Sequence, residues 1–190
     1  MMVIIDDFIK DRTLLEEVSA SCEFHTARQW GWWDANSPPR NLRERVLDCI
    51  WGAGCPVNVL RDRVGGGIEY WTLAHGHSQS DPAPTVSPGK DRLIAHRDRD
   101  EALFSETGKE VHPRMGSVYY PIEHDVSGGW LHVYDGDVED GASVKVEPKH
   151  NRLVMFDVSK LHEVTPVISG LRYAMASNIW DYKIATPPRA

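Results

Sequence analysis

Apolar and polar positions follow two different periods along the chain. In the first third, apolar side chains recur three and four positions apart, as in amphipathic helices that pack through one face. One such stretch is residues 11–22, DRTLLEEVSASC, with Asp6 or Asp7 as the candidate N-terminal cap, and a second is residues 40–51. The apolar run MVIIDDF at the start predicts a strand that precedes both helices.

After Gly67 the pattern changes to short runs of β-branched and aromatic residues, which are typical of strands. Gly, Asp and Pro separate these runs and indicate turns between them. Seven or eight short strands joined by turns predict a mainly β fold, a sandwich or barrel, that follows the N-terminal helices. The predicted strands are residues 68–74, 92–98, 117–122, 130–134, 142–147, 151–158, 162–167 and 171–182.

Residues 75–91, HGHSQSDPAPTVSPGKD, interrupt the strand pattern. This segment contains three Pro, has no apolar period and is longer than an ordinary connection between strands. Loops of this kind often carry function, so we predict that it forms a lid over a site, with residues 99–112 as the opposite wall. His75 and His77 at its start are a candidate metal pair, but solvated loop histidines are the simpler interpretation.

The length and composition are those of one globular domain. With 190 residues, 41% of them hydrophobic and 26% charged, the chain can bury a single core. We predict one domain over residues 1–190, in which residues 1–60 form a helical support and residues 67–182 form the β core. No apolar stretch approaches the ~18 residues that predict a membrane helix, and the acidic N-terminus is unlike a signal peptide.

Charge and cysteine usage narrow the function further. The net charge is −7 and no block of Lys and Arg occurs, so the chain lacks the basic footprint of a nucleic-acid-binding protein. Cys22, Cys49 and Cys55 are odd in number and match no disulfide or metal framework, which predicts reduced thiols in a cytoplasmic protein. A small acidic ligand is still compatible with the charge, because one Arg can bind a carboxylate locally.

Candidate chemistry begins in the stretch LIAHRDRDE with His96 and Asp98. Residues two apart on a strand point to the same side, so an imidazole and a carboxylate would project together. His162 opens another predicted strand, and Arg172 follows it ten residues later, after a short turn. We expect the two strands joined by that turn to be neighbours, which would place Arg172 near His162.

Two imidazoles and one carboxylate on one face have a specific use in metal chemistry. They can bind an octahedral ion through three ligands and leave three positions open, as in the facial triad of non-haem Fe(II) oxygenases. The open positions can chelate a 2-oxo acid and take O2, while an arginine pairs with the far carboxylate. The same letters, HRD, occur in protein kinase catalytic loops, but the chain lacks the other kinase motifs and is too short.

Together, these residues resemble the 2-oxoglutarate- and Fe(II)-dependent dioxygenases, in particular the prolyl-4-hydroxylase-like branch. The resemblance covers residues 93–180, in phrases that follow one another in the family's order. It implies a double-stranded β-helix, or jelly roll, which agrees with the predicted strands. The phrases are HRDRDE, GKEVHPRMGSVYYP, SGGWLHVY and RLVMFDVSKLHEVTPVISGLRYAMASNIW.

The resemblance implies a role for each residue of the motif. His96, Asp98 and His162 would bind Fe(II), and Arg172 and Tyr120 would bind the far carboxylate of 2-oxoglutarate, with no catalytic side chain beyond the metal centre. The implied reaction hydroxylates a C–H bond of a prolyl residue or a related amino-acid-type substrate, consuming O2 and releasing succinate and CO2. The substrate would be an amino acid, a peptide or a small molecule, and ascorbate would support activity.

The chain departs from the family pattern next to the arginine. Family members often carry Ser or Thr two or four residues after it, where this chain has Ala174 and Ala176. The second anchor of the carboxylate is therefore open. An alternative from another class is a metal-binding jelly roll, a cupin-like isomerase or a binding protein, without 2-oxoglutarate turnover. Arg172 argues against this alternative, because simple metal binding needs no carboxylate anchor.

A few residues with chemical potential fall outside the motif. Trp30, Trp32 and Trp33 form a dense cluster that is either core or a clamp on the substrate. His132 lies in a predicted strand and could line the barrel. Asp100 could approach the metal ligands through a bend in the chain and support them from behind.

Overall fold

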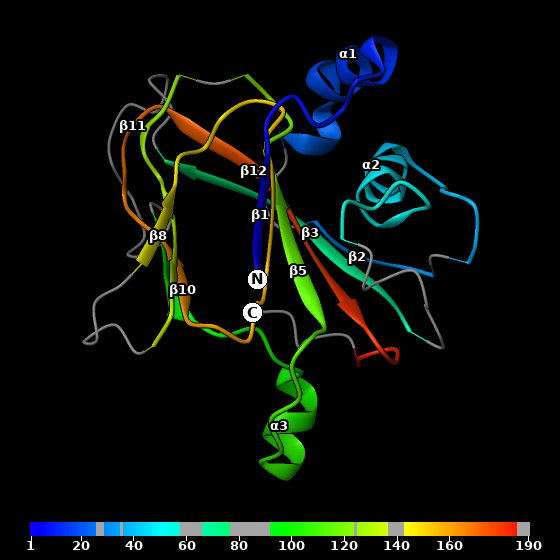
Figure 1. Cartoon of the computed structure of the whole chain (residues 1–190), viewed down its shortest axis with the longest axis vertical. Coiled ribbons are helices and arrows are strands. Elements are labelled where there is room, and N and C mark those ends of the chain that lie inside the picture. The colour runs from blue at the N-terminus through cyan, green and yellow to red at the C-terminus, as the bar shows by residue number, and fades with distance from the viewer. Residues whose placement is uncertain are drawn as a thin grey trace.

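The computed structural model describes residues 1–25, 29–34, 36–57, 66–76, 92–123, 125–136 and 143–185. Within these ranges, most strands form two antiparallel sheets that face each other across a shared apolar core (Figure 1). Helices from the first part of the chain lie beside the larger sheet. This mainly β arrangement confirms the predicted jelly-roll class. None of the helices in the described ranges has the length and apolar character needed to span a membrane.

The larger sheet has six strands, of which the two longest, β3 (Gly67–Gly76) and β12 (Leu171–Trp180), are neighbours. These two strands pair antiparallel over ten residues each. Because side chains alternate across a strand, one face of β12 points into the barrel and the other points toward the helices. The complete order is β1 (Met2–Ile5), β9 (Leu153–Phe156), β5 (Met115–Tyr119), β12, β3 and β2 (Trp30–Trp33).

The smaller sheet faces the interior surface of β12 and its neighbours. Leu131 and Val133 of this sheet share an apolar cluster with Val154, Phe156 and Ala174 of the larger sheet. This shared core holds the two sheets together, and a cavity lined by side chains of both sheets lies beside it. The order is β4 (Leu93–His96), β10 (His162–Val164), β7 (Leu131–Tyr134) and β8 (Ser143–Val146), and two further short strands, β6 (Ser127–Gly128) and β11 (Val167–Ser169), pair with each other.

The first helix, α1 (Arg12–Ala20), confirms the helical period of residues 11–22 but not its predicted cap. Asp11 is the cap, because its Oδ1 accepts from the backbone N–H groups two and three residues later, at 2.9 and 3.2 Å. The prediction of Asp6 or Asp7 as cap is wrong. Asp7 instead adopts a left-handed backbone conformation, with φ of 51°, before the helix begins.

The second helix, α2 (Leu42–Trp51), lies against the outer face of the larger sheet (Figure 1). Its Asn41 cap accepts from the N–H of Glu44 at 3.0 Å. The Trp51 indole donates to Ser177 of β12 at 2.9 Å, so the helix is tied directly to the strand that carries the predicted arginine. A 3₁₀ turn, η1 (Cys22–Phe24), connects the first helix to this support. The N-terminal helices therefore hold the rigid outer side of the sheet.

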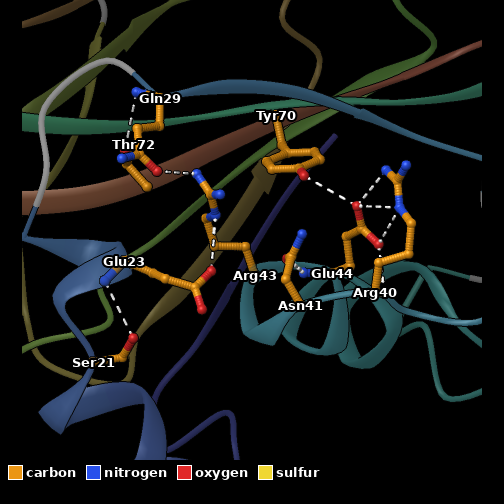
Figure 2. Close-up of polar contacts among 9 residues, drawn as sticks. All are labelled: Ser21, Glu23, Gln29, Arg40, Asn41, Arg43, Glu44, Tyr70 and Thr72. Carbon is orange, nitrogen blue, oxygen red and sulfur yellow. Dashed lines mark hydrogen bonds and ion pairs between the residues drawn. The ribbon is translucent and has the colours of Figure 1, made fainter.

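One buried carboxylate, Glu44, joins α2 to β3. Its side chain has no exposed surface and accepts from the Tyr70 hydroxyl of β3 at 3.1 Å. Arg40 donates to the same carboxylate from its guanidinium and, at 2.7 Å, from its backbone N–H (Figure 2). Figure 2 shows that Arg43, the residue directly before Glu44, reaches toward Glu23 and Gln29 instead. Burial alone would raise the pKa of Glu44, but the hydrogen bonds from Arg40 and Tyr70 outweigh it, so the pKa is lowered.

Replacing Glu44 with glutamine should lower the free energy of unfolding by about 2 kcal/mol, because charge-assisted hydrogen bonds are lost. A carboxylate with a lowered pKa stabilises the fold fully above its ordinary value of 4.5, and this contribution is lost as the pH falls below that value. Urea unfolding at neutral and at acidic pH should therefore show a smaller acid loss in E44Q than in the wild type. Equal acid losses would contradict this role for Glu44.

The sequence does not predict strands β2, β6 and β11 or helix α3 (Glu101–Thr107). Residues 99–112 therefore contain a helix instead of the predicted loop wall, and in Figure 1 this helix projects away from the strands. Asp100 caps it by accepting from the Leu103 N–H at 3.0 Å, and its other oxygen accepts from Tyr182 at 2.9 Å. Asp100 thus supports α3, and the prediction that it could support the metal ligands is wrong.

Candidate metal centre

The pairing of β4 with β10 brings two histidines together. His96 ends β4, His162 begins β10, and the two are direct partners in the antiparallel register. Their ring centroids lie 4.3 Å apart. The predicted strand over residues 92–98 is too long, because β4 ends at His96. Asp98 nevertheless stays on the same side, and its backbone N–H donates to the Val158 carbonyl at 3.0 Å.

The side chains of these residues converge on one point. Asp98 Oδ1 lies 3.3 Å from His96 Nε2 and 3.8 Å from His162 Nε2. One ligand atom from each of the three residues falls within 4.8 Å of the others, which makes them the only such His/Cys/Asp/Glu group within the ranges the structure describes. Three donor atoms at this separation can bind one metal ion.

The far nitrogen of each imidazole fixes how the ring faces this point. His96 Nδ1 lies 2.8 Å from the Ile94 carbonyl and His162 Nδ1 lies 2.9 Å from the Lys160 carbonyl. A carbonyl only accepts hydrogen bonds, so both Nδ1 atoms must carry the proton. The lone pair of each neutral ring is then on Nε2 and points toward Asp98, as a metal ligand requires.

Electrostatics within the group are compatible with a bound cation. Burial opposes a charged His96, but the hydrogen bond to Asp98, the charge of Asp98 and the Ile94 carbonyl together outweigh burial, so the pKa of His96 is raised. Burial also opposes ionisation of Asp98, yet the two imidazoles and Asn178 lower its pKa. Burial dominates at His162 and lowers its pKa. An ionised carboxylate between two imidazoles fits a divalent ion, and two nitrogens with one oxygen on one face fit Fe(II).

Arg172 lies on the inner face of β12 and lines the same cavity as His96, Asp98 and His162. We refer to these last three residues as the metal face. The side chain is 1% exposed, and its Nε makes no hydrogen bond. Its other nitrogens meet two neutral groups, the Tyr120 hydroxyl at 3.3 Å and His75 Nδ1 at 3.5 Å. A buried guanidinium with an unsatisfied N–H and no carboxylate contact in the described ranges is costly, so this end of the cavity fits an anion from outside.

Two predictions about this neighbourhood are wrong. His162 and Arg172 do not lie on neighbouring strands, because β10 belongs to the smaller sheet and β12 to the larger one. They face the same cavity from opposite sides, with β11 between them along the chain. His75 is not a solvated loop residue. It belongs to β3, is 7% exposed and is the direct partner of Arg172 in the β3–β12 register.

The remaining sequence candidates fall in several places. Trp33 is core, while Trp30 is half-buried and bonds to Glu69 of β3 at 2.8 Å. His132 does not line the barrel, because it pairs with Glu163 at 3.3 Å and its strand neighbours Leu131 and Val133 face the core instead. The predicted lid, beyond its first two residues, and His77 lie outside the described residues.

Sequence reasoning missed three residues that complete the site. Asn178 donates from Nδ2 to Asp98 Oδ2 at 2.9 Å, and Glu69 lies directly opposite Asn178 in the β3–β12 register. Gly129 leaves room for the arginine, since a Cβ there would lie 2.9 Å from Arg172 Cδ. The pair of glycines at this position could have been identified from the sequence. The meeting of Asn178 and Glu69 could not, because it depends on the strand register.

A family model described as 2OG-Fe(II) oxygenase superfamily matches residues 62–180, which is more than half of the chain. No curated protein sequence matches the chain.

Several solved structures share the fold at low sequence identity. A Pseudomonas putida prolyl-4-hydroxylase superposes with a TM-score of 0.61 at 18% identity, covering 96% of this chain and 93% of that one. A Trichoplax adhaerens prolyl hydroxylase, in complex with a hypoxia inducible factor peptide, gives 0.55 at 17% identity over 95% and 83%. A viral collagen prolyl hydroxylase from Paramecium Bursaria Chlorella virus-1, in a 2OG complex, gives 0.51 at 15% identity over 96% of both chains.

Proposed function

The chain belongs to the 2OG-Fe(II) oxygenase superfamily, and on that premise we propose that it hydroxylates a C–H bond of a prolyl residue or a related amino-acid-type substrate. The co-substrate 2-oxoglutarate would be converted to succinate and CO2. The observation that carries the proposal is the meeting, in one cavity, of a His-Asp-His face and a buried arginine with an unsatisfied N–H.

Within this proposal, His96, Asp98 and His162 hold the metal. Iron bound there supplies the oxidative chemistry with O2 and the 2-oxo acid. The Ile94 and Lys160 carbonyls accept from the Nδ1 atoms of the two imidazoles, which orients each ring so that Nε2 is the atom that faces the metal position. The protein also shields the metal face on the side of His162, which is 5% exposed and packs edge-on against Phe156 at 5.1 Å between centroids.

Arg172 and Tyr120 are proposed to bind the far carboxylate of 2-oxoglutarate. The guanidinium offers donors in a fork that matches a carboxylate, and the Tyr120 hydroxyl adds one more. His75 Nδ1 accepts from the guanidinium, since an arginine only donates, and this contact orients the fork from its other side. The hydroxyl that family members often place two or four residues after the arginine is absent, and Ala174 is fully buried in the core.

The wall of the cavity favours an aliphatic reacting group. Apart from the metal face, Arg172, Asn178 and one serine, its lining is apolar. Trp71 and Leu73 of β3 and Leu93 of β4 belong to this apolar lining. Such a wall suits a prolyl ring or another aliphatic amino-acid side chain. The names of the fold relatives, which include a collagen prolyl hydroxylase and a prolyl hydroxylase in complex with a hypoxia inducible factor peptide, support a prolyl substrate for this chain.

The cysteines support the proposed compartment. Cys22, Cys49 and Cys55 are odd in number and match no disulfide framework, as is usual in a reducing, cytoplasmic environment.

Succinate release tests the function directly. The purified protein would be incubated with Fe(II), 2-oxoglutarate, ascorbate and a panel of prolyl peptides and free amino acids, with succinate measured and mass spectrometry used to detect the gain of one oxygen atom. We expect coupled turnover with at least one member of the panel. Metal binding without any succinate release, coupled or uncoupled, would instead favour the metal-binding jelly roll without 2-oxoglutarate turnover.

Replacing Gly129 with alanine should weaken 2-oxoglutarate binding by about tenfold or more. Gly129 has φ of +66°, and a Cβ there would meet Arg172 Cδ at 2.9 Å, so the arginine must shift. G108A is the matched control, because Gly108 has φ of +70° but nothing lies within 4 Å of its Cβ position. Both variants should lose about 1 kcal/mol of stability from the strained φ. Equal 2-oxoglutarate affinity in G129A and G108A would contradict the placement of the carboxylate.

A further inference from the structure

The two oxygens of Asp98 have different surroundings. Oδ1 faces the two imidazole Nε2 atoms, at 3.3 and 3.8 Å. Oδ2 accepts from the amide nitrogen of Asn178 at 2.9 Å. A carboxylate whose second oxygen is already bound to a donor binds a metal through one oxygen only, which leaves the adjacent coordination position open. The contact from Asn178 is therefore placed where it can control how Asp98 acts as a ligand.

Asn178 is itself fixed by a second carboxylate. Glu69 lies directly opposite it in the β12–β3 register, so the two side chains stand next to each other on the same side of the sheet. Burial raises the pKa of Glu69, and the neighbouring Asn178 acts against that rise. The amide nitrogen donates to Asp98 Oδ2, and an ionised Glu69 only accepts hydrogen bonds, so both carboxylates favour the amide nitrogen on their side. Were the amide rotated, its oxygen would face carboxylate oxygens on both sides. Glu69 thus prevents the rotated state and keeps a donor on Asp98.

Glu69 is held in turn by two indoles from different strands. Trp30 of β2 donates to Oε1 at 2.8 Å, and Trp180 of β12 donates to Oε2 at 3.1 Å. Glu69 is 9% exposed, and no Lys, Arg or His in the described ranges forms an ion pair with it. Burying a carboxylate without a cation is costly, and a neutral side chain would suit a purely structural position better. The presence of a buried carboxylate at this position, beside Asn178, points to a role at the metal face.

We propose that Glu69 and Asn178 are positioning residues that hold Asp98 as a one-oxygen metal ligand. The proposal rests on the proposed metal role of His96, Asp98 and His162. It also explains one member of the tryptophan cluster, because Trp30 becomes the outer end of a chain that runs from the edge strand β2, through Glu69 and Asn178, to the metal face. Figure 1 shows β2 beside β3 on this side of the sheet.

The experiment measures Co(II) binding to the full-length protein by titration calorimetry, together with the visible absorption spectrum of bound Co(II). The spectrum reports the number of ligands, which changes if Asp98 binds through both oxygens. N178L should weaken Co(II) binding by about 10- to 100-fold, as is usual when a residue that orients a ligand is lost, and should alter the spectrum. E69Q should show a smaller change in the same direction, and W30F the smallest.

The control is E44Q, which neutralises another buried carboxylate, located on helix α2 against the outer face of the same sheet and with no contact to the metal face among its hydrogen bonds and ion pairs. It should lower stability and leave both the Co(II) affinity and the spectrum unchanged. The unfolding temperature of each metal-free variant shows whether that variant folds. If N178L does not fold, the results with E69Q and W30F decide the test. Unchanged affinity and spectrum in the folded variants would overturn the proposal, as would losses no larger than those in E44Q.

The two proposals fail in different ways. If the wild type binds Co(II) and H162A does not, the metal face stands, and the results with Asn178 and Glu69 then judge the positioning role alone. If the wild type binds no Co(II), the proposed function fails, and the positioning role fails with it.

Discussion

Replacing His162 with alanine is expected to abolish metal binding and succinate release together. His162 supplies one of three converging ligand atoms, and the β4–β10 pairing leaves no other side chain directly opposite His96. Loss of a residue that only orients a ligand costs about 10- to 100-fold in metal affinity, so loss of a ligand itself should cost more than about 100-fold. Calorimetry with Co(II), and Fe(II) retained after desalting, measure this effect.

H132A is the matched control for this experiment. His132 lies on β7, which pairs directly with β10, but its ring contacts Glu163 and its neighbours Leu131 and Val133 face the core instead. The same histidine-to-alanine change one strand away should therefore leave the affinity for Co(II) and the turnover unchanged. Full activity in H162A, or equal losses in H162A and H132A, would remove His162 from the metal face.

The sequence predicts the three residues of the metal face because their chemistry is local. His96 and Asp98 are two residues apart, so any extended backbone places them on one side. His162 was a candidate because it opens a later predicted strand, and the resemblance gave it the role of third ligand. The reasoning that placed Arg172 on the strand next to His162 was wrong. A turn between two strands does not say which sheet each strand joins, and in a jelly roll successive strands cross between sheets.

The contacts around the metal face could not be predicted, because they depend on strand register. Asn178 and Glu69 are more than 100 residues apart, and they meet only because β12 and β3 pair in one particular register. Alternation along β12 places Asn178 on the same face as Arg172, but the residue of β3 that lies opposite Asn178 depends on how the two strands are aligned. His75 was misread for the same reason, since its partner across the register is Arg172.

Short elements were missed for a different reason. Helix α3 has seven residues, too few to show a helical apolar period. Asp100 and Gly108 are nevertheless residue types that typically begin and end a helix. Asp100 caps the first turn, and Gly108 ends the helix in a left-handed conformation with φ of 70°. The cap at Asp11 was missed because the prediction chose Asp6 or Asp7, which come earlier in the chain.

Replacing Arg172 with methionine is expected to raise the 2-oxoglutarate requirement by roughly 30-fold to several thousand-fold while Co(II) affinity stays unchanged. Truncating one partner of a buried charge pair costs about 2–5 kcal/mol, and each 1.4 kcal/mol is about tenfold in affinity. R172K should fall between the wild type and R172M, because lysine keeps the charge but not the fork of donors. Calorimetric titration of the Co(II)-loaded protein with 2-oxoglutarate measures the change.

The same substitution should affect the ligand-free protein in the opposite direction. Arg172 is 1% exposed, its Nε has no hydrogen-bond partner, and its remaining contacts are to the neutral Tyr120 and His75. Replacing a buried charge by an apolar side chain of similar volume is often neutral or stabilising by about 1–4 kcal/mol. R172M should therefore unfold at an equal or higher temperature without 2-oxoglutarate, and it should gain less than the wild type when 2-oxoglutarate is added. If R172M instead lost stability without ligand and kept its 2-oxoglutarate affinity, Arg172 would be a structural residue and another cation would have to bind the carboxylate.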